Sequence, residues 1–190
     1  MLTLIMPDDY ELVDGCRRQD RIVQRQLYER FAGRLFVVCK RYCRDTQDAE
    51  DVLQESFVKA YRYIDRFRFD GPLEGWLKRI VINTALKHTK QQKPWANSTD
   101  VDNILQTGCL AQAEDALPAL NYQFLLALIQ ELPAGCRTIF NLYAIEGHTH
   151  VEIAQLLGLA EGTSKSQYAR ARMLLQQKLM NEVGRTNEPV

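Results

Sequence analysis

The chain contains 190 residues, and its 24 basic and 24 acidic side chains give a formal net charge of zero. This balance excludes a uniformly basic surface for nucleic acid, whereas the 46% of hydrophobic residues is ample for packed cores. No segment approaches the roughly 20 consecutive apolar residues of a membrane span. Because the N-terminus lacks a basic segment followed by an apolar one, we expect no secretory signal and a cytoplasmic protein.

Charge is unevenly distributed along the chain, although its total is zero. Residues 66–93 contain seven basic and two acidic side chains, and residues 163–185 contain five basic and one acidic. Between them, residues 94–118 contain four acidic side chains and no lysine or arginine. Because the local field attracts a protein to phosphate, two basic patches separated by an acidic connector suggest two separate contacts with nucleic acid.

Apolar residues recur at helical spacing along most of the chain, and no convincing two-residue alternation indicates a strand. We therefore expect an all-α protein. The first helices are predicted over residues 9–18, 21–43 and 47–64, with Thr46 capping the third.

A Gly-Pro pair predicts a loop over residues 67–72, with Pro72 in the first turn of the next helix. That helix is expected to run to about Lys90, with Trp76 in the apolar stripe that faces the core. The aromatic residues of the segment 61–69 suit either a core or a DNA contact, and the pattern leaves both roles open.

The segment 91–113 has weak periodicity and contains proline, glycine and asparagine, which is typical of a linker. Beyond it, two more helices are predicted over residues 119–132 and 134–145, before a final helical pair.

The chain therefore divides into two small helical domains joined by a flexible linker. The expected bounds are 1–91 for the first domain, 92–115 for the linker, 116–184 for the second domain and 185–190 for a disordered tail. Two DNA contacts tethered in this way bind as one, because the linker raises the effective concentration of the second contact.

Residues 151–172 predict two short helices joined by a tight turn. Ile153 and Leu157 mark the inner face of the first helix, and the small Ala154 permits close approach of the second. Gly158 tolerates the positive φ that the turn requires. The second helix then presents hydroxyl, amide and cationic groups suited to phosphates and base edges: Thr163, Ser164, Lys165, Ser166, Gln167, Arg170 and Arg172. The pattern is typical of a helix-turn-helix that binds duplex DNA, although a helical hairpin that binds nothing is the alternative.

Five cysteines, at positions 16, 39, 43, 109 and 136, are an odd number without a Cys-x-x-Cys pair. Cys39 and Cys43 share a helix face, which permits half of a zinc site, but buried reduced thiols are favoured because no further ligands lie nearby in the sequence. The chain also shows no catalytic triad order, no phosphate-binding glycine loop and no metal-ligand cluster. We therefore expect no enzyme activity, no cofactor and no metal.

Several segments, taken in order, resemble motifs of bacterial sigma factors. Asp48–Phe57 resembles their motif for binding core RNA polymerase, and residues 67–83 resemble their promoter-melting segment. Residues 132–143, together with the helix-turn-helix, resemble their C-terminal domain. The two-domain form is similar to the extracytoplasmic-function (ECF) subfamily of the sigma-70 family, and the resemblance extends from about Tyr10 to Leu179.

This resemblance implies an alternative sigma factor that binds core RNA polymerase, through the β′ clamp and the β flap, and directs it to promoters. Residues 1–91 would be sigma region 2, and residues 116–184 would be sigma region 4. Promoter DNA and an anti-sigma factor anchored in the membrane are the further partners that it implies. A stand-alone helix-turn-helix regulator is the alternative function.

The resemblance also implies a role for particular residues. Core polymerase would be bound by an acidic helix face: Asp48, Glu50, Asp51, Gln54 and Glu55. The −10 element would be melted and recognised by a loop and the helix after it: Phe67, Phe69, Asp70, Asn83, Lys87 and Lys90. The −35 element would be recognised by the second helix of the helix-turn-helix. Ser164 stands where the family often has a β-branched apolar residue, and we expect Tyr168 to fill that space.

Overall fold

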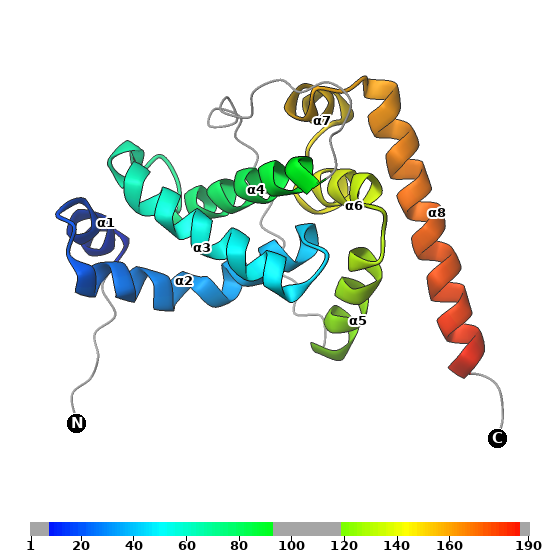
Figure 1. Cartoon of the computed structure of the whole chain (residues 1–190), viewed down its shortest axis with the longest axis horizontal. Helices are drawn as coiled ribbons and strands as arrows, with labels where there is room; N and C mark the ends of the chain where they lie inside the picture. Colours follow the sequence, from blue (N-terminus) through cyan, green and yellow to red (C-terminus); the bar gives the residue numbers. More distant parts are fainter. Residues whose placement is uncertain (1–7, 93–118, 187–190) are drawn as a thin grey trace.

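The computed structural model describes residues 8–92 and 119–186, and every regular element in these two ranges is helical (Figure 1). The expected all-α class is therefore confirmed. The elements are α1 (Asp9–Arg17), α2 (Arg21–Tyr42), α3 (Thr46–Tyr63), η1 (Ile64–Arg66), α4 (Leu73–Gln92), α5 (Ala119–Gln130), α6 (Ala134–Phe140), η3 (Asn141–Ile145), α7 (His150–Leu157) and α8 (Glu161–Thr186). The predicted linker, residues 92–115, lies outside the described residues except for Gln92. Helix α8 includes the first two residues of the predicted tail, 185 and 186.

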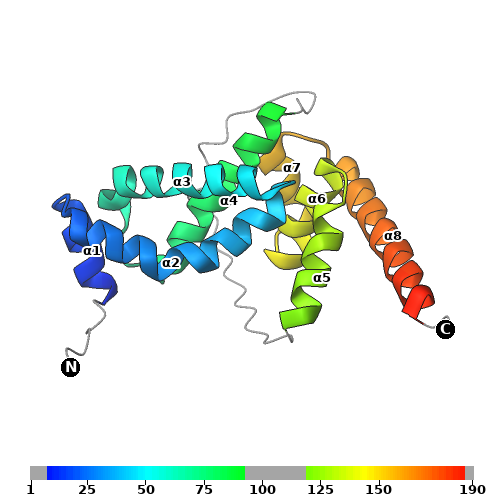
Figure 2. The ribbon, with the colours of Figure 1, turned by 60° about the horizontal axis from the view of Figure 1, so that its bottom comes forward.

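The first domain is a bundle in which α2, α3 and α4 each pack against the other two (Figure 2). Its core is formed by buried side chains that recur at helical spacing, among them Leu27, Phe31 and Leu35 of α2 and Val52 and Phe57 of α3. Helix α1 packs against α2 and closes one end of the bundle. The apolar periodicity of the sequence thus predicted both the helices and their inner faces.

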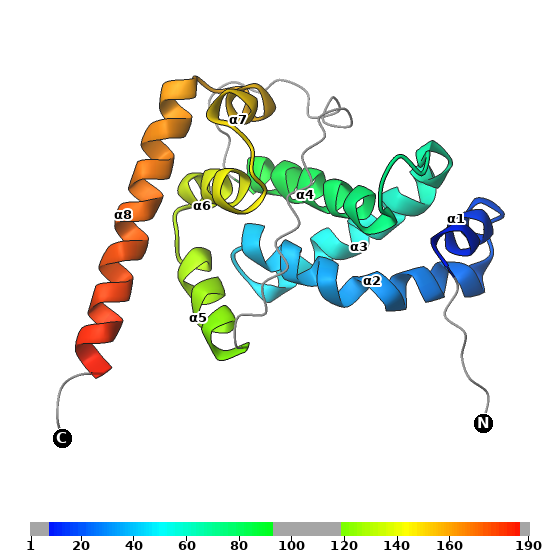
Figure 3. The same cartoon turned by 180° about the vertical axis from the view of Figure 1, so that it is seen from behind.

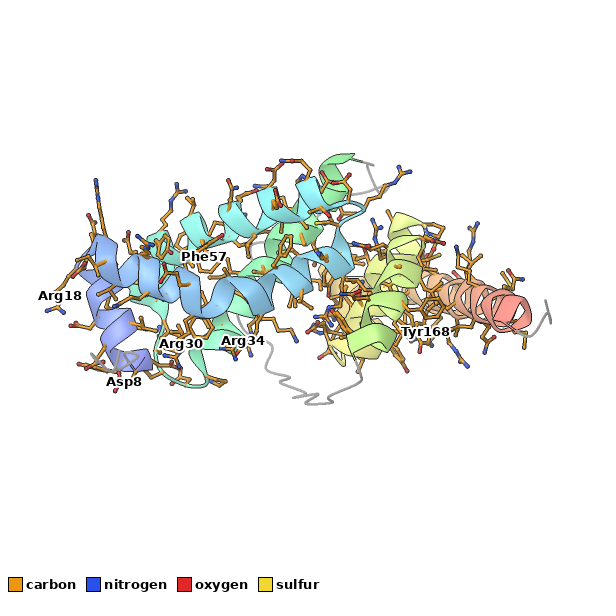
Figure 4. All side chains as sticks on the ribbon, turned by 90° about the horizontal axis from the view of Figure 1, so that it is seen from below. Asp8, Arg18, Arg30, Arg34, Phe57 and Tyr168 are labelled. Atoms are coloured by element: carbon orange, nitrogen blue, oxygen red, sulfur yellow. The ribbon has the colours of Figure 1, made fainter. Side chains whose placement is uncertain are left out.

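Ion pairs tie the outer parts of the first domain to α2. Arg30 lies 2.9 Å from Asp9 of α1, and Arg34 lies 2.7 Å from Glu74 of α4. Figure 4 shows both arginines along α2, and Phe57 between α2 and α3. The ring of Phe57 packs on Tyr28, with 4.7 Å between the ring centroids. The contact between Phe57 and Tyr28 therefore helps to pack α3 against α2.

The cap of α3 differs from the predicted one by a single residue. The side chain of Asp45, whose backbone is extended, accepts a hydrogen bond of 2.9 Å from the amide of Asp48. Thr46 is already the first helical residue, so the prediction that it caps the helix was wrong. Aspartate and threonine both serve as caps, and the choice between neighbours depends on where the preceding chain arrives.

The second domain contains α5 to α8, with α6 and α7 both packed against α8. The expected helix over residues 134–145 changes character at Asn141, where five residues adopt a π-helix, η3. Such widened turns admit one extra residue and are often found at functional positions. Glu146 caps the C-terminal end of η3, and its amide donates a hydrogen bond to the carbonyl of Asn141.

The two domains are in contact in this structure. Helices α5 and α6 lie beside the C-terminal end of α2, as the view from behind shows (Figure 3). Ile139, Leu142, Ile153 and Leu157 of the second domain belong to the same buried apolar cluster as the core of the first. The described residues thus form one continuous body.

Candidate protein and nucleic-acid interfaces

The acidic face predicted on α3 is present and points away from the bundle core. Glu50, Asp51, Gln54 and Glu55 are exposed, whereas Val52 and Leu53 on the opposite side are buried. Asp48 is the exception, because it is half-buried and its carboxylate lies 3.9 Å from Nε2 of His88 on α4. Four of the five predicted residues therefore share one accessible surface.

This surface continues onto α2, which the sequence did not indicate. Glu50 and Gln54 line a shallow groove together with Leu53 of α3 and four residues of α2: Tyr28, Ala32, Gly33 and Phe36. The acidic rim therefore borders an apolar floor. A helical partner with basic and apolar faces would suit this combination, because charge complementarity guides encounter and apolar contact adds burial.

The loop before α4 borders an open pocket with both charged and apolar lining. Its walls come from residues 65–68 and 70–72 and from the first turns of α4, including Gly75, Trp76 and Arg79. Asp70 and Phe69 are exposed, and Phe69 adopts a positive φ of 59°. That backbone conformation is uncommon for a large side chain, which indicates that the surrounding contacts hold it in place.

Phe67 does not belong to the exposed set predicted for this loop. It is only 5% exposed, and its ring packs against Phe69 and Trp76 at centroid distances of 4.8 and 5.6 Å. Phe67 therefore packs in the core and also lines the pocket, and its predicted DNA contact stays a prediction. Trp76, which was expected in the core, is half-buried and also lines the pocket.

Arg17 of α1 holds the loop in shape, a contact that the sequence did not predict. Its Nη2 donates a hydrogen bond of 2.8 Å to the carbonyl oxygen of Phe67, and its guanidinium lies 5.9 Å from the centre of the Phe69 ring. Tyr10, also of α1, stacks on the Phe69 ring from 5.6 Å. The loop is thus preorganised by a helix about 50 residues earlier in the chain.

Along α4, the three predicted polar residues differ in accessibility. Lys87 is exposed, and Asn83 and Lys90 are half-buried. The amide oxygen of Asn83 is itself buried. The cationic Lys87 is the member of this set that is open to a phosphate.

The helix-turn-helix has the predicted turn. Gly158 adopts a left-handed conformation with φ of 65°, and Ile153 and Leu157 are buried on the inner face of α7. Thr149 and Glu152 form a capping box at the start of α7, which lowers the pKa of Glu152 through hydrogen bonds from Thr149. The capping box fixes where α7 begins, and Gly158 ends it at the turn toward α8.

Ser164 is the buried member of the set predicted to contact DNA, and its contact with DNA stays a prediction. It is fully buried, and its hydroxyl lies 2.9 Å from Nδ1 of His150, so it links α8 to α7 inside the motif. Tyr168 packs beside this pair, against Tyr143 and His150 at centroid distances of 4.5 and 5.7 Å. A small hydroxyl side chain and an aromatic ring thus occupy the space between the helices.

The other predicted residues of α8 lie on two sides of the helix, with Lys165 and Arg172 on the side away from Thr163. Thr163, Lys165, Ser166, Arg170 and Arg172 are exposed, and Gln167 is half-buried, accepting a hydrogen bond from the thiol of Cys136. Lys165 forms an ion pair of 2.6 Å with Glu161 in the preceding turn. The set combines cationic and hydroxyl groups at the N-terminal part of the helix, which is the part that enters a major groove in this motif.

The described cysteines are buried and free: Cys16, Cys39, Cys43 and Cys136. Burial raises the pKa of Cys39 and of Cys43 to about 12. The neighbouring Cys43 raises the pKa of Cys39 further, and Asp48 raises that of Cys43. Both side chains are therefore neutral thiols at pH 7. Cys109 lies outside the described residues. In residues 8–92 and 119–186 no group of three or more metal ligands occurs, and no helix there is long and apolar enough to cross a membrane.

Comparison with known families agrees with this division of surfaces. Residues 27–94 match the model of sigma-70 region 2, and residues 123–175 match that of sigma-70 region 4. RNA polymerase sigma-H factor of Pseudomonas aeruginosa is 31% identical over 189 residues, covering 93% of this chain and 96% of that protein. ECF RNA polymerase sigma factor SigM of Mycobacterium tuberculosis is 32% identical, covering 88% of this chain and 82% of that protein. The chain is an ECF sigma factor of the sigma-70 family.

This ECF sigma factor binds core RNA polymerase and directs it to promoters, as the family does. The match to region 2 gives no support to the stand-alone regulator, because such a regulator would need only the helix-turn-helix. The solved structure of the sigma factor RpoE from Bartonella quintana, in complex with the anti-sigma factor NepR, has the same fold. Its TM-score is 0.51 at 23% identity, and the alignment covers 82% of this chain and 96% of that one.

Proposed function

We propose that three exposed surfaces of this ECF sigma factor each bind a different partner. The acidic face of α3 binds the β′ clamp, the loop after η1 with α4 opens and recognises the −10 element, and α8 recognises the −35 element. The observation that carries the proposal is the separation of these surfaces, each formed by residues that are accessible while the core beneath them is complete.

Run-off transcription tests the proposal as a whole. Purified core polymerase and a pool of genomic promoters should give discrete transcripts only when the sigma factor is added. RNA synthesis belongs to the polymerase, and we infer that the sigma factor itself has no catalytic activity. We also infer that it acts in the cytoplasm, because core polymerase and promoter DNA are located there.

At the core polymerase, we propose that Glu50, Asp51 and Gln54 contact the β′ clamp, with the groove between α2 and α3 receiving apolar side chains of the same helix pair. The second domain would contact the β flap. Glu55 plays a smaller part, because it already forms an ion pair of 2.8 Å with Lys59.

At the −10 element, we propose that an unstacked base enters the pocket that Asp70 and Trp76 line, next to the exposed ring of Phe69. Asn83 would read a base edge, and the exposed Lys87 would hold the strand backbone, whereas the Nζ of Lys90 is buried. Pockets of this type hold a single base by stacking and by a few hydrogen bonds, and this offsets the cost of unstacking it.

At the −35 element, Arg170 should contact a phosphate or a base edge. Arg170→Ala should weaken the binding of holoenzyme to duplex promoter, because a cationic contact is lost. If the contact is to phosphate, the slope of log K against log salt should fall by about one unit without a change in sequence preference. Arg25→Ala is the matched control, since Arg25 lies on α2 and is paired with Glu29. Equal affinity and slope in wild type and Arg170→Ala would remove Arg170 from the interface.

We also propose regulation by an anti-sigma factor anchored in the membrane. Support for an anti-sigma partner comes from the solved RpoE–NepR complex, in which a protein of this fold is bound to an anti-sigma factor, and the membrane anchor rests on the family resemblance alone. A tagged copy of the chain, isolated from its native host, should carry a membrane protein with it. That protein, once purified, should inhibit run-off transcription in proportion to the amount added.

A further inference from the structure

A row of four aromatic rings, each in contact with the next, leads from the core of the first domain to its surface. Trp76 of α4 is half-buried, and Phe67 is 5% exposed. Further out, Phe69 is 41% exposed, and Tyr10 of α1 is 65% exposed. From Trp76 outward, neighbouring ring centroids are 5.6, 4.8 and 5.6 Å apart. The proposed capture of a base uses the pocket and Phe69, and it gives the outermost ring no role.

The Tyr10 ring has one face against Phe69 and the other in solvent. Its plane makes an angle of 30° with that of Phe69, which is a stacked arrangement, and most of the side chain is exposed. A single exposed tyrosine would need no explanation. Tyr10 differs because it continues a row of rings that begins in a pocket, and an open aromatic face is the group on which unpaired bases stack.

Helix α1 presents this ring on a fixed backbone. The side chains of Asp8 and Glu11 form a capping box at its start. Near its end, Gly15 lies so close to α2 that a Cβ there would be 2.7 Å from the side chain of Val23. A tyrosine on such a helix has only two side-chain torsions to order, so a base can stack on it at little cost in conformational entropy.

Cations lie along the way from the pocket to Tyr10. Arg66 and Arg68 line the pocket and are exposed, and the guanidinium of Arg17 lies 5.9 Å from the centre of the Phe69 ring. A strand that places one base in the pocket therefore has partners for its phosphates on this side. Successive nucleotides of one strand rise about 3.4 Å in a duplex, so a base within about three nucleotides of the captured one can reach the Tyr10 ring.

We propose that Tyr10 is a second base-stacking site, which holds an unpaired base close to the one that enters the pocket. The inference rests on the proposed melting of the −10 element. A second stack offsets part of the cost of unstacking and lengthens the strand that the sigma factor holds open. Because every base has an aromatic face, this site contributes to melting and not to the choice of sequence.

Binding of the holoenzyme to single-stranded DNA tests the site. The probes are labelled oligonucleotides of either strand from the −10 region of a promoter found by run-off transcription, and fluorescence anisotropy gives the affinity. Tyr10→Ala should weaken binding of the preferred strand roughly fivefold or more. Tyr10→Phe should bind as the wild type does, whereas Tyr10→Leu, which keeps an apolar cover over Phe69 without a ring, should lose nearly as much as alanine. Ile22→Ala is the control, because Ile22 is 70% exposed on the neighbouring α2.

Oligonucleotides with one abasic nucleotide at a time locate the stacked base. At one position, the abasic change should weaken binding by the wild type and cause no further loss in Tyr10→Ala. Such non-additivity is the mark of two groups in direct contact. Phe69→Ala should show the same behaviour at a different position.

Equal binding by Tyr10→Ala and wild type would overturn the second site. So would a loss in Tyr10→Ala that Tyr10→Leu restores and that no abasic position removes, because Tyr10 would then only cover Phe69. A fall in affinity for core polymerase alone would also overturn it, by assigning the ring to a contact with the polymerase. Failure of the proposed function would look different, since the holoenzyme would then bind neither strand better than core does and no position would couple to Phe69.

Discussion

Asp51→Lys should weaken the binding of this ECF sigma factor to core polymerase by about 2–5 kcal/mol, which is a loss of roughly thirtyfold or more. Asp51 is exposed on α3, opposite the buried Val52 and beside Gln54 at the rim of the apolar groove. On the proposed contact, the new lysine would face a basic side chain of the β′ clamp, at a surface that loses water when the two proteins bind. Fluorescence anisotropy of a labelled sigma factor with purified core measures the effect directly.

The control for this experiment is Asp14→Lys, which makes the same change of charge on α1. Asp14 forms an exposed ion pair of 3.0 Å with Arg18, and such surface pairs contribute little to stability. The control should bind core as the wild type does. Unchanged affinity in a folded Asp51→Lys variant would show that the β′ clamp contacts another face.

The second large effect is expected at the −10 loop, where two neighbouring phenylalanines should behave in opposite ways. Phe69 is 41% exposed beside the pocket-lining Asp70, whereas Phe67 lines the pocket and is only 5% exposed. Phe69→Ala should leave core binding and folding near normal but reduce open-complex formation roughly five- to 150-fold, because one base–aromatic stack is worth about 1–3 kcal/mol. Phe67→Ala should instead destabilise the first domain by about 3–5 kcal/mol, because it leaves a cavity.

Permanganate footprinting of a promoter distinguishes these outcomes. With Phe69→Ala holoenzyme, thymines at the −10 element should become less reactive, and a premelted bubble should restore part of the loss. Thermal unfolding should separate the pair, since only Phe67→Ala should lower the Tm markedly. Equal thymine reactivity in wild type and Phe69→Ala would place base capture elsewhere, and Asn83 would be the next residue to test.

The helix assignments and the α3 surface could be predicted because both depend on local periodicity. A carboxylate at Asp51 and an apolar side chain at Val52 must point to different sides of any helix, whatever surrounds it. The turn of the helix-turn-helix could also be predicted, because the left-handed backbone at its corner favours glycine and Gly158 is present there. The match of motif order to the sigma family then supplied the function.

The burial of individual side chains could not be predicted in the same way. Phe67 and Phe69 are both aromatic and two residues apart, yet only Phe67 is buried, while Phe69 stacks on Tyr10 of α1 at the surface. Ser164 appears among polar neighbours in a basic helix, and only the approach of His150 removes it from the surface. In each case the group in contact is distant in sequence, so the local pattern contains no signal for it.

By itself, the sequence determined the all-α class, the two domains of the sigma family and the helix faces that can meet polymerase and DNA. Periodicity, turn residues and motif order are properties of short segments, and they do not depend on the tertiary arrangement. Only the tertiary structure decided which groups remain accessible, and it alone revealed that Glu146 joins the domains. Its two cationic partners lie 105 and 68 positions away, at Arg41 and Lys78, and pairing over such separations depends on how the helices pack.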